Sequence, residues 1–207
     1  MDNLINCNQV DLIGFISKSA EFNYESYGEK FYRIVVNVPR TSGYEDEIPV
    51  LVSDHLCKPN TFLEGQFISI SGQFRSSNNS DGQKQRLILF VFALDIDFVS
   101  ENVCYTNSIE LEGFICKKPH YRLTPFEREI TDVLLAVNRS YGKSSFIPCI
   151  CWGRNARYAY DLEVGSRVKI CGRIQSREYQ KCISDTETET RVAYEVSVSK
   201  IELVEEE

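Results

Sequence analysis

Short runs of alternating or β-branched apolar residues recur along the whole chain, and clusters of Gly, Pro, Asn and Ser separate them. This pattern predicts β-strands joined by turns. In the first half of the chain, strands are expected at residues 9–17, 31–38, 47–53, 66–74 and 86–99. In the second half, they are expected at residues 107–116, 128–138, 146–152, 166–176 and 191–204. We therefore expect an all-β protein.

One helix is expected within the second set of strands. The segment Arg154–Leu162 has helical composition and is followed by Gly165, a residue suited to ending a helix. Its counterpart in the first set, Leu56–Leu63, contains Pro59, so a shorter or irregular helix is expected there.

The two sets of strands belong to an internal repeat. Val10–Ile16 recurs 99 residues later as Ile109–Ile115, with the glycine kept. Two further pairs of segments keep nearly the same offset, namely Ile34–Arg40 with Val133–Arg139, and Phe62–Gly72 with Asp161–Gly172. We expect one domain at residues 1–103 and a second at residues 104–207.

Each copy has five predicted strands, with a short helix between the third and the fourth. This is the layout of the OB-fold, a small Greek-key barrel, so we expect two tandem OB-fold barrels. The pattern alone leaves a five-stranded sandwich open.

The net charge of the chain is −7, from 23 Lys and Arg against 30 Asp and Glu, which by itself argues against a general binder of polyanions. The repeat divides this charge unevenly. Residues 1–103 hold 8 basic and 14 acidic residues, a net of −6, whereas residues 104–207 hold 15 and 16, a net of −1. Arg139–Lys181 holds 9 basic and 3 acidic residues, a net of +6. A basic strip is therefore expected on the second copy.

Several classes of protein are excluded. No apolar run approaches the roughly 18 residues that span a bilayer, and the N-terminal segment lacks signal-peptide features. The eight cysteines are therefore expected to be reduced thiols of a cytoplasmic protein. His55 and His120, the only histidines, lie in no nucleophile or zinc motif. We expect no enzyme, no catalytic residue, no cofactor, no metal, no small-molecule substrate and no membrane partner.

Most of the second copy resembles a known family. The motifs that carry the resemblance are Thr124–Arg139, Phe146–Ala156, Leu162–Tyr179 and the Val-rich segment Val192–Val204. In order and spacing they are similar to bacterial single-stranded DNA-binding proteins. The resemblance implies an OB-fold that binds single-stranded DNA without sequence preference and without catalysis. It also implies that Phe146, Trp152 and Tyr179 are stacking platforms.

Strand periodicity provides an independent argument. Phe146 and Trp152 share one face of the third strand, whereas Ile147, Cys149 and Cys151 share the other. The fourth strand likewise has a ladder of cations on one face and apolar residues on the other. Because apolar faces back onto a core, the aromatic residues and the cations are expected to face water, where stacking and phosphate contacts together bind a single strand. The expected nucleic-acid-binding residues are Arg139, Lys143, Phe146, Trp152, Arg154, Arg167, Lys169, Arg173, Arg177 and Tyr179.

The first copy lacks this combination, because Glu47 and Ser53 stand at the positions of Phe146 and Trp152. We expect it to be a diverged partner that serves in oligomerisation, in weaker binding or in both.

These patterns favour non-enzymatic binding of single-stranded DNA, in DNA replication, recombination or repair. Two copies per chain predict a homodimer with four OB-folds. Two alternatives stay open, an RNA-binding tandem OB protein and a structural or assembly module that mainly binds protein. A lone strand Trp is often a core residue and a basic ladder is often only a solvated face. The loss of both features in the first copy favours the functional interpretation.

Overall fold

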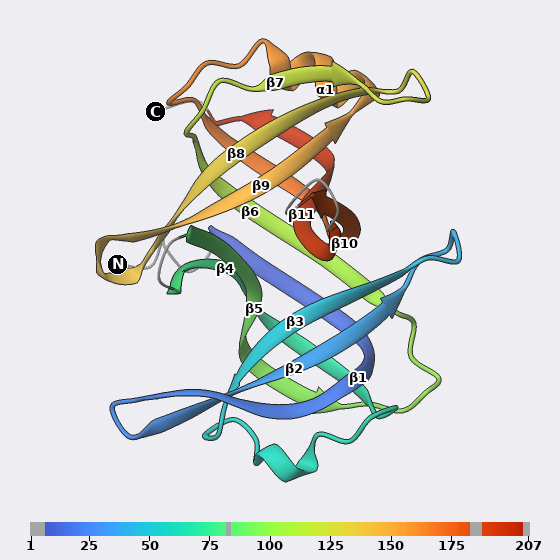
Figure 1. Cartoon of the computed structure of the whole chain (residues 1–207), viewed down its shortest axis with the longest axis vertical. Helices are drawn as coiled ribbons and strands as arrows, with labels where there is room; N and C mark the ends of the chain where they lie inside the picture. The colour runs from blue at the N-terminus through green and yellow to red at the C-terminus, as the bar shows by residue number, and fades with distance from the viewer. Residues whose placement is uncertain (1–6, 82–83, 183–187, 205–207) are drawn as a thin grey trace.

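The computed structural model describes residues 7–81, 84–182 and 188–204. Its elements form two similar units, the lower and upper halves of Figure 1. The first unit comprises β1 (Asn8–Ser26), β2 (Glu29–Pro39), β3 (Glu45–Ser53), a 3-10 helix (Pro59–Thr61), β4 (Phe67–Asp81) and β5 (Lys84–Phe98). The second comprises β6 (Thr106–Ile115), β7 (His120–Leu123), β8 (Glu129–Arg139), a 3-10 helix (Ser140–Gly142), β9 (Lys143–Trp152), α1 (Gly153–Tyr160), β10 (Arg167–Cys182) and β11 (Thr188–Leu203).

Each unit is a closed barrel of five strands. In the first unit, β1 pairs with β2, β2 with β3, β3 with β5 in parallel, β5 with β4, and β4 with β1. In the second unit, β6, β8, β9, β11 and β10 close the same circuit, and β7 pairs with β8. A sandwich would leave open sheet edges, which this closure removes. The prediction of two OB-folds is therefore confirmed, and the sandwich alternative is wrong.

The glycine kept at the start of the repeat has a steric cause. A Cβ atom on Gly14 would lie 2.3 Å from the carbonyl oxygen of Asn37, and one on Gly113 would lie 2.4 Å from that of Ala136. Both distances are far shorter than a van der Waals contact, so only glycine lets the first strand of each barrel pass this close to the next strand.

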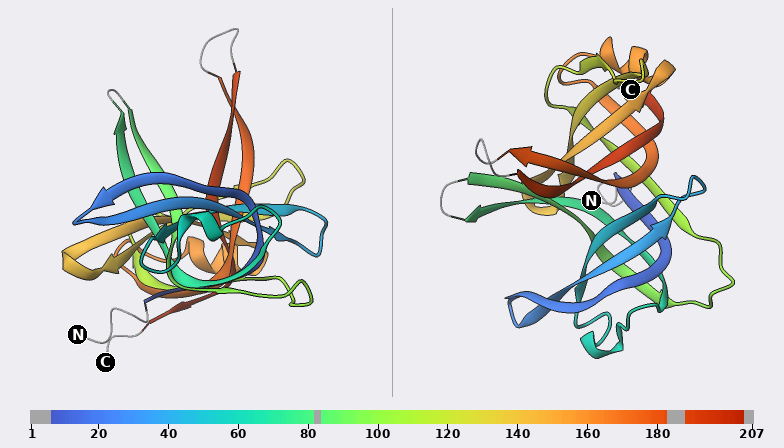
Figure 2. Two further views of the ribbon diagram at one scale, coloured as in Figure 1. Left: turned by 90° about the horizontal axis from the view of Figure 1, so that it is seen from below. Right: turned by 45° about the vertical axis from the view of Figure 1, so that its right-hand side comes forward.

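Several strands are longer than the sequence predicts. β1 continues to Ser26 instead of ending at residue 17, because it bends through register shifts and stays paired with β2. β4 and β10 run beyond their barrels as arms paired with β5 and β11, and both arms project in the same direction (Figure 2). The arms are polar and lack the alternation of apolar and polar residues that predicts a half-buried strand, so the sequence does not predict them.

The helices follow the sequence closely. α1 spans Gly153–Tyr160 where Arg154–Leu162 was expected, and its counterpart is a single 3-10 turn that starts at Pro59. Neither α1 nor any other helix in the described part of the chain is long and apolar enough to cross a membrane.

The barrels are joined through their first strands. β1 pairs antiparallel with β6, from Asn8 opposite Leu111 to Ile13 opposite Thr106. The eleven strands of the described residues consequently form one continuous sheet. The position of one barrel against the other is therefore fixed by backbone hydrogen bonds.

Candidate nucleic-acid interface

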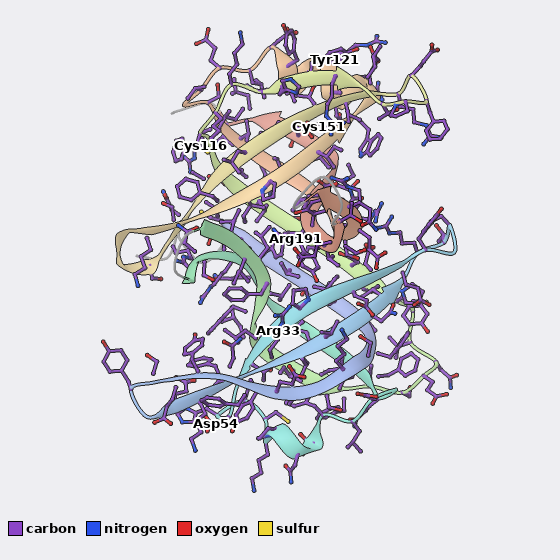
Figure 3. All side chains as sticks on the ribbon, in the orientation of Figure 1. Arg33, Asp54, Cys116, Tyr121, Cys151 and Arg191 are labelled. Atoms are coloured by element: carbon purple, nitrogen blue, oxygen red, sulfur yellow. The ribbon has the colours of Figure 1, made fainter. Side chains whose placement is uncertain are left out.

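Strand β9 presents two aromatic side chains to solvent. Phe146 is 43% exposed and Trp152 is 37% exposed. Ile147, Cys149 and Cys151 point the other way into the core, and Figure 3 places Cys151 within the second barrel. At these five residues, the alternation expected for this strand is confirmed.

Trp152 stands at the end of β9, between two grooves. One lies toward β7, where Tyr121, which Figure 3 labels, packs against Tyr160 of α1 with ring centroids 5.7 Å apart. The other has a volume of about 650 Å³ and lies between the barrels. Its lining residues are Arg40, Tyr44, Glu45, Glu47, Trp152, Gln175, Ser176, Arg177, Glu178 and Val192. The first barrel therefore borders the platform formed by Trp152.

Tyr179, the third expected platform, lies within β10 rather than after it. It stands opposite Arg191 of β11 on the projecting arm and is 37% exposed. Figure 3 labels Arg191 on this arm. The sequence pattern predicts that the fourth strand ends at residue 176. It therefore does not predict that Tyr179 lies on a paired strand.

The cation ladder of β10 faces outward, but its cations already have carboxylate partners. Arg167 donates two hydrogen bonds to Glu112, and the Lys169 Nζ atom lies 3.2 Å from Glu110 Oε2. Both glutamates belong to the neighbouring strand β6. The hydrogen bond to Glu110 raises the pKa of Lys169, because it favours the charged amine.

The remaining two cations of the ladder are also paired. The Arg173 Nη1 atom lies 3.3 Å from Asp46 Oδ2, a carboxylate of the first barrel that is almost fully buried. The Arg177 Nε atom lies 3.9 Å from Glu195 Oε1 on β11. The sequence pattern does not predict these partners, since they lie on other strands and in one case in the other barrel.

Three other expected cations are free of carboxylates. Within residues 7–81, 84–182 and 188–204, Arg139, Lys143 and Arg154 form no ion pair. Arg139 and Lys143 are opposite each other at the ends of β8 and β9, and Arg154 is exposed on α1. Unpaired positive charge therefore flanks both ends of the strand that carries Phe146 and Trp152.

The matching face of the first barrel has a different chemistry. Ser53 donates a hydrogen bond to Glu29, and its hydroxyl accepts one from the His55 N–H at 3.0 Å. The Glu47 N–H donates to Ser176 of the second barrel at 3.2 Å. A glutamate and a hydrogen-bonded serine thus stand where the second barrel has its two aromatic platforms.

The first barrel also holds an aromatic cluster. Tyr24 stacks on Phe31 with ring centroids 4.8 Å apart, and Phe31 lies 5.9 Å from Phe92. The Arg75 guanidinium lies 3.8 Å from the centre of the Phe92 ring. These residues come from β1, β2, β4 and β5, so the cluster as a whole depends on the tertiary structure.

Comparisons with known proteins identify relatives of the chain. Residues 106–204 match the model of the single-strand binding protein family. Single-stranded DNA-binding protein B of Bacillus subtilis is 35% identical over 81 residues, which are 36% of this chain and 72% of that protein. Single-stranded DNA-binding protein A of the same organism is 36% identical over 81 residues, 36% of this chain and 47% of that protein, so the chain spans about half the length of this relative.

A solved structure matches nearly the whole chain. The wild-type single-stranded DNA binding protein from Thermus aquaticus covers 97% of this chain and 94% of its own, with a TM-score of 0.77 and 19% sequence identity. At this identity, the match shows a shared fold of both barrels.

Proposed function

Because the chain belongs to the single-strand binding protein family, we propose that it binds single-stranded DNA, without catalysis, by base stacking and phosphate contacts. The observation that carries this proposal is the exposure of Phe146 and Trp152 on one face of β9. Exposed aromatic rings beside cations suit the planar bases and the phosphates of a single strand. Each stacked base contributes about 1–3 kcal/mol.

The cations contribute unequally to this binding. Arg139, Lys143 and Arg154 gain a counterion when a phosphate approaches, because in the described part of the chain they have none. Arg167, Lys169, Arg173 and Arg177 exchange a carboxylate for a phosphate, so each gains less. Tyr179 extends the stacking surface along the arm of β10 and β11.

The assembly in this proposal is a homodimer. Two OB-folds per chain then give four in total, enough to wrap a single strand in replication, recombination or repair in the cytoplasm. Sedimentation equilibrium tests the stoichiometry, with an expected mass of twice the 23.8 kDa of one chain.

Fluorescence tests the binding directly, because Trp152 is the only tryptophan. Titration with oligo-dT is expected to quench its emission, and the affinity is expected to fall as salt rises, since bound phosphates release counterions. Duplex DNA of equal length and oligo-U are the comparison ligands. A folded sample whose emission and sedimentation are unchanged by oligo-dT would contradict the proposal. Tighter binding of oligo-U would assign RNA as the ligand.

A further inference from the structure

Strand β10 of the second barrel meets β3 of the first at a contact that we call the Asp46 junction. The Ser176 N–H donates to Asp46 Oδ1 at 2.8 Å, and the Glu47 N–H donates to Ser176 Oγ at 3.2 Å. The Asp46 side chain is 1% exposed and forms ion pairs with Arg40 and Arg173. This carboxylate therefore neutralises positive charge contributed by both barrels.

The internal repeat produces a second contact of the same design, which we call the Ser145 junction. Here β4 of the first barrel meets β9 of the second. The Ser76 N–H donates to Ser145 Oγ at 3.2 Å, and the Phe146 N–H donates to Ser76 Oγ at 2.8 Å. Ser145 and Phe146 stand 99 positions after Asp46 and Glu47. The two hydrogen bonds are kept, but a serine hydroxyl takes the place of the carboxylate.

Two arginines belong to the strands that form or border the Ser145 junction, Arg75 to β4 and Arg139 to β8, which pairs with β9. Arg139 is the counterpart of Arg40 in the repeat, and its Nε atom is buried without a hydrogen-bond partner in the described part of the chain. Arg75 precedes Ser76 on β4 and donates to Gln73 Oε1 at 2.8 Å. Among the described residues, neither arginine forms an ion pair.

The electrostatics agree with this geometry. Burial, together with the nearby charge of Arg139, lowers the pKa of Arg75 to about 10. Arg75 remains charged at neutral pH, and its charge and that of Arg139 repel each other in a partly buried site. An anion held between them would relieve that repulsion.

We propose that the Ser145 junction is a phosphate-binding site of the seam between the barrels, in which Arg75 and Arg139 hold one phosphate of a bound single strand. This proposal rests on the proposed function. Guanidinium groups match phosphate oxygens with paired N–H donors. Phe146, whose own backbone forms part of the junction, stacks a base next to that phosphate. The strand consequently passes from the second barrel onto the first at this point, and the first barrel takes part in binding through Arg75.

The Asp46 junction indicates which substitution tests the proposed site. Ser145→Asp places a carboxylate where the sister junction has one, at the position that accepts the Ser76 N–H. Ser145→Asn is the matched control, since its amide oxygen accepts the same hydrogen bond without a charge. Ser145→Asp is expected to weaken oligo-dT binding by about tenfold at low salt. It is also expected to make the slope of log affinity against log salt shallower by about 0.7, the value of one phosphate on a single strand. Ser145→Asn adds no charge, so its loss of affinity is expected to be smaller and its salt slope is expected to stay that of the wild type.

A second variant keeps the test decisive if the buried aspartate prevents folding. Arg75→Gln removes one of the two cations at a position where the sister barrel has Gln175, and it is expected to produce the same loss of affinity and slope. If both Ser145→Asp and Arg75→Gln bind oligo-dT with the affinity and the salt slope of the wild type, the proposed phosphate site is wrong. The proposed function would still stand. A change in oligomeric mass without a change in DNA binding would also overturn the proposed phosphate site, because the site would then bind a protein carboxylate.

Inorganic pyrophosphate separates this site from the proposed function. It is expected to raise the melting temperature of the wild type and of Ser145→Asn, but not that of Ser145→Asp. The wild type could fail to bind oligo-dT while pyrophosphate still raises the melting temperature of the wild type and of Ser145→Asn but not that of Ser145→Asp. In that case the anion site is supported and the proposed function is wrong. Equal responses of all three proteins to pyrophosphate would show an adventitious ion only.

Discussion

The Asn8 side chain hydrogen-bonds both backbone groups of Phe74. Its Nδ2 atom donates to the Phe74 carbonyl at 2.7 Å, and its Oδ1 atom accepts the Phe74 N–H at 2.9 Å. The register that pairs Val10 with Gly72 would bring Asn8 opposite Phe74, so the amide side chain extends the ladder beyond its last backbone pair. Asn107 makes the same two bonds with Ile174 in the second barrel, at 2.7 and 2.9 Å.

Asn8→Ala is therefore expected to lower the free energy of unfolding by about 2–4 kcal/mol, because it leaves a buried N–H and C=O without partners. Urea denaturation followed by circular dichroism measures the loss. Gln9→Ala, at the neighbouring exposed position, is the control and is expected to change stability by less than about 0.5 kcal/mol. Equal stability of the two variants would contradict this role of Asn8.

Asp46→Asn tests the Asp46 junction itself. We expect a loss of about 3–5 kcal/mol, because Arg40 and Arg173 lose a buried carboxylate that compensates both. The same denaturation experiment measures it, with Asp95→Asn on the exposed face of β5 as the comparison. A change as small as that of Asp95→Asn would mean that the junction contributes no stability.

The Glu112→Gln and Glu110→Gln double variant releases Arg167 and Lys169 from their partners. If the bound strand follows the ladder of β10, affinity for oligo-dT is expected to rise and the salt dependence to steepen, since two cations gain access to phosphate. Stability is expected to change little, because exposed ion pairs contribute little. Unchanged DNA binding would place the strand away from this part of β10.

Phe146→Ala is expected to weaken oligo-dT binding by about 1–3 kcal/mol, the contribution of one stacked base. Phe126→Ala, which removes an 85% exposed phenylalanine from a loop of the same barrel, is the matched control. Isothermal titration with oligo-dT measures both, and we expect the control and Ser53→Ala to bind like the wild type. An equal loss in all three variants would argue against stacking on Phe146.

The cysteines provide a pH-dependent prediction. Burial raises the pKa of the Cys151 thiol to about 12 and that of Cys149 well above its ordinary value, whereas Cys104 is exposed. At pH 8, a maleimide is expected to modify Cys104 rapidly, and to modify Cys149 and Cys151 only after denaturation. Mass spectrometry of the labelled protein measures this. Rapid labelling of all three sites would show that the second barrel opens.

The raised pKa of Cys151 also predicts how the stability of the fold changes with pH. The folded pKa of Cys151 lies above the value of about 9 in the unfolded chain, so the neutral thiol stabilises the fold below pH 9 and that contribution is lost as the pH rises toward 12. Cys151→Val is expected to show a shallower loss of stability over this range. Parallel curves would contradict the buried thiol as the cause.

The sequence by itself determined the two barrels and the orientation of β9. Strand alternation is a local property, and the repeated Gly14 and Gly113 mark the same close approach of strands in both copies, so the period of two is enough to assign Phe146 and Trp152 to the outer face. The tertiary structure alone decided which cations are free. The partners of Arg167 and Arg173 come from β6 and from the first barrel, and the proximity of Arg75 to Arg139 requires two strands from different barrels. Charge neutralisation depends on the distances between charged groups on different strands. The fold sets those distances, and the local sequence pattern does not show them.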